Sequence, residues 1–168
     1  MHKLLPITLL GFSLSSLATD ITLDFSGVVK QSSCEINSGT LNQEINMGQI
    51  KLNQFNGPGT TVNQRHFTLK LTGCQGVAAV DVYMTGVPDS DNSDYFSLTN
   101  DSEQATGVAL SISTMDGMLH KPQGNIVTTP INEDNEKWLN YIVSYVQTKG
   151  TVTAGKANSI ADYTVVYK

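Results

Sequence analysis

The sequence is poor in charge, in cysteine and in basic clusters, and each shortage excludes a class of protein. Charged residues make up 15% of its 168 residues, well below the roughly 25% of typical soluble domains. The ten Lys and Arg residues form no cluster and the formal net charge is −5, which argues against binding to nucleic acid or to anionic lipid. Two cysteines cannot make a zinc-finger site by themselves.

Uncharged polar residues supply most of the polarity instead. The chain holds 15 Ser, 18 Thr and 13 Asn, a composition that suits a β-rich protein outside the cytoplasm. Its length leaves room for one domain.

The first 18 residues have the pattern of a secretory signal peptide. Lys3 precedes an apolar run from Leu4 to Leu14, and small residues up to Ala18 precede the expected cleavage site. A retained membrane anchor is the alternative, but the run is shorter than the roughly 20 residues that a membrane-spanning helix needs. We therefore expect residues 1–18 to be removed and the chain not to span a membrane.

Export makes a disulfide between Cys34 and Cys74 the expected state of the two cysteines. The loop it closes would constrain the unfolded chain by about 4 kcal/mol. A reactive thiol pair is the alternative, but it needs CxxC-like spacing and an electropositive setting, and the sequence provides neither.

Apolar and polar residues alternate with period two through most of the remaining chain, which predicts strands with one buried face. Turn signals rich in Gly, Pro, Asn and Asp separate the runs, and no segment has a sustained helical stripe. Short strands at this spacing indicate an all-β sandwich of the immunoglobulin type. The predicted strands contain Phe67–Leu71, Val80–Met84, Val108–Ile112, Leu139–Tyr145 and Tyr163–Tyr167.

No catalytic or metal-binding motif is present. His66 begins a strand and His120 lies in a turn region, and neither has a partner at metal-ligand or triad spacing. The acidic run 89–94 resembles a calcium loop, but the sixth position is Asp94 and the twelfth is Asn100 where Gly and Glu are required. A solvated loop is favoured, and no cofactor or metal is expected.

The segment after the expected cleavage site is an amphipathic strand. Ile21, Leu23 and Phe25 point to one side of an extended chain, and the residues between them are polar. A chain terminus is normally frayed unless something holds it. The strand therefore pairs either within its own sandwich or with another molecule by β-augmentation.

The opposite end favours pairing between molecules. The last predicted strand reaches Tyr167, and no further strand follows it. In an immunoglobulin-type sandwich this strand has a neighbour on each side, so we expect an exposed edge and an open groove, which must be covered to avoid aggregation.

These patterns resemble the pilin subunits of bacterial chaperone-usher fimbriae, the type 1 fimbrial subunits in particular. The resemblance spans the chain after residue 18. It rests on residues 25–29 followed by Cys34, on residues 69–74 around Cys74, on the run from Thr151 to Ser159 with Gly155, and on the penultimate Tyr167. Where many family members have a pocket-facing glycine in the N-terminal segment, this chain has Ile21.

The resemblance implies an incomplete immunoglobulin-like sandwich that lacks its last strand and is completed by a donor strand. A periplasmic chaperone would lend that strand, and a neighbouring fimbrial subunit would replace it at the outer-membrane usher. By similarity, residues 19–27 form the donor extension, with Ile21, Leu23, Phe25 and Gly27, and residues 28–168 form the pilin domain. The groove that receives a strand would involve Gly155, Tyr163, Val165 and Tyr167.

The resemblance thus implies a structural subunit that is exported through the periplasm to a cell-surface fimbria and supports adhesion. A secreted receptor-binding, lectin-like sandwich is the alternative, and a secreted enzyme is the weakest hypothesis. A major rod subunit and a minor or adaptor subunit fit the sequence equally.

Overall fold

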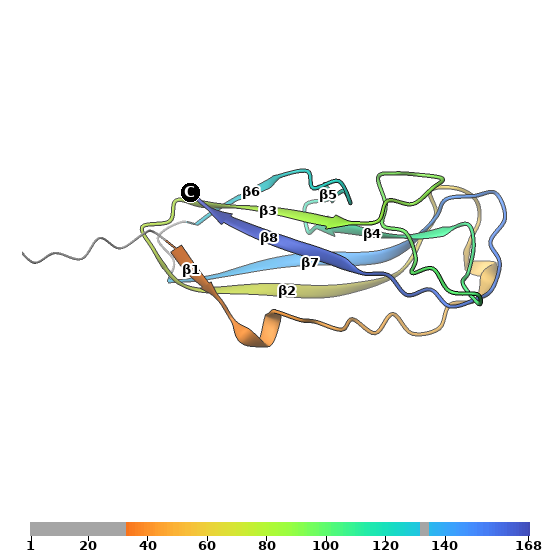
Figure 1. Cartoon of the computed structure of the whole chain (residues 1–168), viewed down its shortest axis with the longest axis horizontal. Helices are drawn as coiled ribbons and strands as arrows, with labels where there is room; N and C mark the ends of the chain where they lie inside the picture. Colours follow the sequence, from red (N-terminus) through yellow and green to blue (C-terminus); the bar gives the residue numbers. More distant parts are fainter. Residues whose placement is uncertain (1–32, 132–134) are drawn as a thin grey trace, which may run out of the picture. The chain divides into compact units, whose positions relative to one another are not determined.

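All five predicted strands form in the computed structural model, which describes residues 33–131 and 135–168 (Figure 1). The only helical elements in these ranges are two single turns of 3₁₀ helix, and no helix there is long and apolar enough to cross a membrane. The strands are β1 (Ser33–Ile36), β2 (Thr61–Gln75), β3 (Ala79–Gly86), β4 (Val108–Thr114), β5 (Leu119–His120), β6 (Val127–Pro130), β7 (Glu136–Gln147) and β8 (Ala161–Tyr167); the turns are η1 (Ser38–Thr40) and η2 (Leu52–Gln54).

The strands build two antiparallel sheets that pack face to face. The large sheet has the order β1-β2-β7-β4-β5 and the small sheet the order β6-β3-β8. Figure 1 shows them as two layers, with β2 and β7 in one and β3 and β8 in the other. The predicted all-β sandwich is therefore confirmed.

The core lies between the two sheets and is built from the alternate residues of each strand. Leu69 and Leu71 of β2 and Val80 of β3 are fully buried, and Val82 is 1% exposed. Cys34 of β1 and Cys74 of β2 are buried and joined by a disulfide, which confirms the predicted pair. The disulfide fixes β1 to the edge of the large sheet.

Strand β8 differs from the others because it has a strand on one side only. Within the described ranges it pairs with β3, in register from Val80 opposite Tyr167 to Gly86 opposite Ala161, and its other edge carries no strand. Its inward-facing residues are only half-buried, although they pack against the core: Ala161, Tyr163, Val165 and Tyr167. The small sheet thus ends in an open edge, as expected from the sequence.

The predicted signal peptide, residues 1–18, and the predicted donor extension, residues 19–27 with Ile21, Leu23, Phe25 and Gly27, lie outside the described residues.

Candidate functional site

A groove of about 1350 Å³ opens between the two sheets beside the free edge of β8. Its floor is apolar and comes mainly from the inward faces of the large sheet. One side is formed by the start of β8 and the segment before it, and the other by the extended segment from Leu41 to Ile50. The floor residues are Phe67, Leu69, Leu110, Ile112, Val143 and Tyr145, together with Met84 of the small sheet.

The wall opposite β8 is an extended segment that forms no strand, and we call residues 41–50 the A wall. Ile45, Met47 and Ile50 are half-buried against the core, and most of the residues between them are exposed. The A wall is held by side chains rather than by a ladder: the Gln43 amide donates to the Thr68 carbonyl at 2.9 Å. This leaves most of its backbone groups free of strand pairing.

Asn63 makes a second attachment of the A wall to β2. Its side-chain amide donates to the Met47 carbonyl, and its backbone has a φ of 57°, in the left-handed region that Asn tolerates better than most residues. The register of β2 against β7 shifts between Val62 and Arg65, around this residue. The bulge therefore turns the Asn63 side chain towards the A wall.

The second wall is the segment that leads into β8, residues 151–160, which we call the F wall. It runs beside residues 97–106: Ala105 N donates to Lys156 O at 2.9 Å and Thr99 N donates to Asn158 O at 2.7 Å. The Tyr145 hydroxyl donates to the Ala157 carbonyl at 2.5 Å from the groove floor. These bonds hold the F wall in place without making it part of either sheet.

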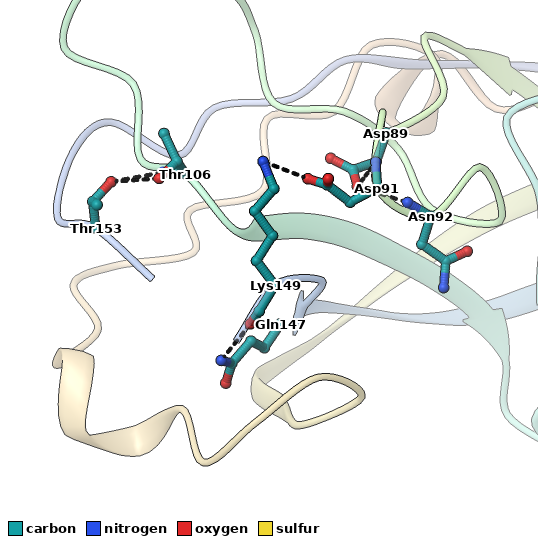
Figure 2. Close-up of polar contacts among 7 residues, drawn as sticks. All are labelled: Asp89, Asp91, Asn92, Thr106, Gln147, Lys149 and Thr153. Atoms are coloured by element: carbon teal, nitrogen blue, oxygen red, sulfur yellow. Dashed lines mark hydrogen bonds and ion pairs between the residues drawn. The ribbon is translucent and has the colours of Figure 1, made fainter. Parts of the chain in front are cut away.

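The outer end of the F wall is fixed by threonine side chains. The Oγ1 atoms of Thr106 and Thr153 lie 2.8 Å apart, and Thr106 N donates to Thr153 Oγ1 at 3.1 Å (Figure 2). Close by, the buried Gln147 amide donates to the Lys149 carbonyl at 2.7 Å and accepts from Gly57 N at 2.8 Å. Thr106 therefore holds the F wall at Thr153, and Gln147 holds the loop that follows β7.

Gly155 occupies a point of the F wall where no side chain fits. A Cβ atom there would lie 2.4 Å from Ala105 N and 2.5 Å from both Gln104 C and Glu103 O. Because all three are backbone atoms, they cannot move aside as the end of a flexible side chain would. The residue lines the groove, and its small size lets the wall approach residues 103–105.

Tyr163 spans the groove from β8 to the opposite side. Its hydroxyl lies 3.1 Å from the Thr40 carbonyl and 3.3 Å from the Leu41 carbonyl, at the start of the A wall. Desolvation raises the pKa of Tyr163 above its ordinary value. Of the predicted groove residues, Gly155 and Tyr163 line it, whereas Val165 and Tyr167 continue the same face of β8 beyond the lining.

The acidic run 89–94 folds into a loop closed by its own side chains. The Asp89 carboxylate accepts from the backbone N–H groups of Asp91 and Asn92, each at 3.1 Å, and Lys149 Nζ lies 3.1 Å from Asp91 (Figure 2). Lys121 Nζ lies 2.7 Å from Asp94. These contacts use the carboxylates within the loop and with lysines, and no cluster suited to a metal ion occurs in the described ranges.

His120 is a buried residue that the sequence placed in a turn region. It belongs to β5, is fully buried, and packs edge-on against the Tyr141 ring at a centroid distance of 5.3 Å. Neither ring nitrogen has a hydrogen-bond partner, and desolvation lowers the pKa of His120 to about 4. It is a neutral core residue, and no group of possible metal ligands includes it among the residues that the structure describes.

The groove and the free edge of β8 together can accommodate an extended chain. The free edge of β8 offers unpaired backbone groups for a new ladder, and the apolar floor offers space for alternate side chains of the same chain. Sequence reasoning found the β8 side but missed the A wall, whose weak signal is the alternation of Ile45 and Met47 with Glu44 and Asn46.

Comparisons with known proteins show which protein family this chain resembles. The profile of the family described as "Fimbrial protein" matches residues 23–168. The chain is 32% identical to Protein LpfE of Salmonella typhimurium, over the whole of this chain and 98% of that protein. It is 30% identical to Long polar fimbria protein A of the same organism, over 94% of this chain and 95% of that protein.

Among solved structures, the Burkholderia pseudomallei antigen and type I fimbria protein is similar, with a TM-score of 0.62 and 27% identity over 80% of this chain and 88% of that one. The P pilus rod subunit PapA has a TM-score of 0.66 at 19% identity, over 80% of this chain and 99% of that one, and so shares the fold. On the sequence match and the fold together, this chain belongs to the fimbrial protein family.

Proposed function

We infer that this chain is a structural subunit of a bacterial surface fimbria whose groove receives a strand from another protein. One observation carries the proposal: an apolar groove runs beside the unpaired edge of β8. Exposed edges of this kind are an aggregation hazard when left uncovered. A strand that fills the groove removes the hazard and completes the sandwich.

The energetics of strand uptake favour a lasting assembly. Each large apolar side chain that leaves water contributes about 1.5–3 kcal/mol, and the added strand also gains backbone hydrogen bonds along β8. Three such side chains, as in Ile21, Leu23 and Phe25 of the predicted donor extension, can therefore hold subunits together without a covalent bond. Residues 19–27 would enter the next subunit, and residues 28–168 would form the body.

The partners are those that membership of the fimbrial family implies. A groove that is open in the isolated chain needs a temporary occupant before assembly, which is the role of a periplasmic chaperone, and an exchange step at an outer-membrane usher would bring in the strand of a neighbouring subunit. The fimbrial names of several relatives, which match over most of this chain, support export to the cell surface and adhesion by the assembled fibre.

The chain is not an enzyme in this proposal. The groove floor consists of aliphatic and aromatic side chains, and His120 is a neutral core residue. A receptor-binding module is the alternative. The length of the match to proteins named as probable fimbrial subunits, LpfE and LpfA of Escherichia coli O157:H7, favours the structural role over it.

Two variants test the proposal: deletion of residues 19–25 tests the donor segment, and Tyr167→Ala tests the groove. The truncated chain is expected to remain bound to the chaperone, because its groove is unchanged, but to be lost from the interior of sheared fibres. Tyr167→Ala, on the face of β8, is expected to reduce chaperone capture and lower the periplasmic level. Met115→Ser, an exposed residue remote from the groove lining, is the control. Normal incorporation of the truncated chain would refute the proposal.

A further inference from the structure

A strand added at the free edge of β8 would place its outward side chains beside those of β8. The outward positions at and just before this strand are Ile160, Asp162, Thr164 and Val166, all of them exposed. Cross-strand neighbours on one face interact directly or diagonally. The outward face of β8 therefore meets every strand that enters the groove, independently of the apolar floor.

Asp162 is the charged residue among these four positions. It lines the groove and lies opposite Thr85 of β3. In the described ranges no basic side chain lies within ion-pair distance of it. The acids that do have a lysine partner are Asp81, Asp91, Asp94, Asp101, Glu103 and Glu136. The rim of the groove thus carries a negative charge that no basic side chain of residues 33–131 or 135–168 neutralises.

The N-terminal segment of this chain has acids on the matching side. With Ile21, Leu23 and Phe25 directed into a groove, the outward side chains are Asp20, Thr22, Asp24 and Ser26. A register that sets Asp162 opposite Asp20 or Asp24 makes a direct like-charge pair.

The remaining registers also bring the charges together. Setting Asp162 opposite Thr22 places an acid on both diagonals, and setting it opposite Ser26 places Asp24 on one diagonal. Diagonal neighbours lie about 7–8 Å apart, within the Debye length of roughly 8 Å at physiological salt. Repulsion therefore occurs in every one of these registers.

We propose that Asp162 selects the strand that enters this groove: it disfavours the chain's own acidic 19–27 segment and favours a strand from a different subunit with uncharged or basic outward residues. This inference rests on the proposed function, since it assumes that a strand enters along β8. The occupant is identified by charge complementarity to the rim.

The test uses the chain without residues 1–18, unfolded and then diluted, at a concentration too low for chains to pair, into buffer with a fluorescently labelled peptide. One peptide has the sequence of residues 19–27, and the second carries Asp20→Lys and Asp24→Lys. Bound peptide is read from fluorescence anisotropy. At low salt the lysine peptide is expected to bind about two- to ten-fold more tightly, and at 1 M salt the difference should shrink towards unity.

Variants of the protein test whether Asp162 causes the preference between the two peptides. Asp162→Asn should reduce the preference and Asp162→Lys should reverse it, whereas Asp116→Lys in the exposed turn after β4 should leave it unchanged. Equal affinity for both peptides, or a preference that does not respond to residue 162, overturns the proposal while leaving strand uptake intact. If neither peptide binds, the proposed function fails and this inference fails with it.

Discussion

Strands β3 and β8 lie side by side in the small sheet and carry the same alternating pattern, yet they are buried to different degrees. Val82 of β3 and Val165 of β8 stand directly opposite each other. Val82 is 1% exposed, whereas Val165 is only half-buried. The two valines face the same core, so the difference comes from their surroundings: β3 has a strand on both sides and β8 has one. Alternation decides which face a residue takes, and neighbouring strands decide how deeply it is buried.

The largest change in stability is expected when the F wall, which leads into β8, is displaced. Gly155→Ala puts a Cβ within 2.5 Å of three backbone atoms, and overpacking of this kind costs about 3 kcal/mol, at the upper end of its usual range. The free energy of unfolding of the strand-complemented protein, measured in urea, should fall by that amount, and peptide capture should weaken with it.

Gly150→Ala is the matched control for this prediction. It adds the same methyl group to the loop after β7, where no atom lies within 4 Å, and it should change the free energy of unfolding by less than about 0.5 kcal/mol. If both glycine variants behave alike, the F wall is not held in the way described.

The opposed valines give a direct measurement of the contrast. Val82→Ala removes fully buried methyl groups and should cost about 2 kcal/mol, whether or not the groove is filled. Val165→Ala should cost less than about 1 kcal/mol with the groove empty, and more when a peptide completes the sheet. Urea unfolding with and without excess peptide measures both. A cost for Val165→Ala that is independent of the peptide would contradict strand addition at β8.

The smallest expected effect is the pH dependence of stability that the buried His120 causes. The pKa of His120 is lowered to about 4 in the folded protein, below the unfolded value of about 6.5. The unfolded chain therefore binds more protons between these values, so stability is complete above pH 6.5 and declines as the pH falls towards 4. Between pH 7 and pH 5.5 the loss should be about 1 kcal/mol.

His120→Phe removes the titrating group while keeping a ring beside Tyr141, so its stability should not change over this pH interval beyond what other groups cause. Urea midpoints of the two proteins at both pH values give the answer. An equal decline in the wild-type and variant proteins would show that another group is responsible.

The sequence predicted the strands in which apolar and polar residues alternate over several consecutive positions. Residues 67–71 alternate clearly because Leu69 and Leu71 lie in the core while Thr68 and Lys70 are only partly buried. Residues 139–141 behave in the same way, with Asn140 exposed between buried Leu139 and Tyr141. The all-β class and the open edge of β8 follow from patterns of this kind, whereas the disulfide follows from the expected export and the two cysteines. Gly155 and Tyr163 were found through resemblance, and the structure supplies a steric reason for the first and a hydrogen-bonding reason for the second.

What the sequence did not reveal depends on contacts between distant segments. The A wall makes no ladder and is held by single side chains such as Gln43 and Asn63, which have no local pattern. Phe96 is fully buried in a segment that forms only isolated bridges. His120 was placed in a turn because Gly and Pro surround it, but pairing with Ile112 of β4 draws it into the core.

The disulfide also determines how the subunit carries a pulling force. In the proposed assembly, tension along residues 19–27 would reach Cys34 first, and the disulfide would transmit it directly to Cys74 at the end of β2. The residues between the two cysteines, which include the A wall and most of β2, lie outside this covalent path. In the proposed assembly, tension along residues 19–27 would therefore not pull on the A wall through the backbone that precedes it.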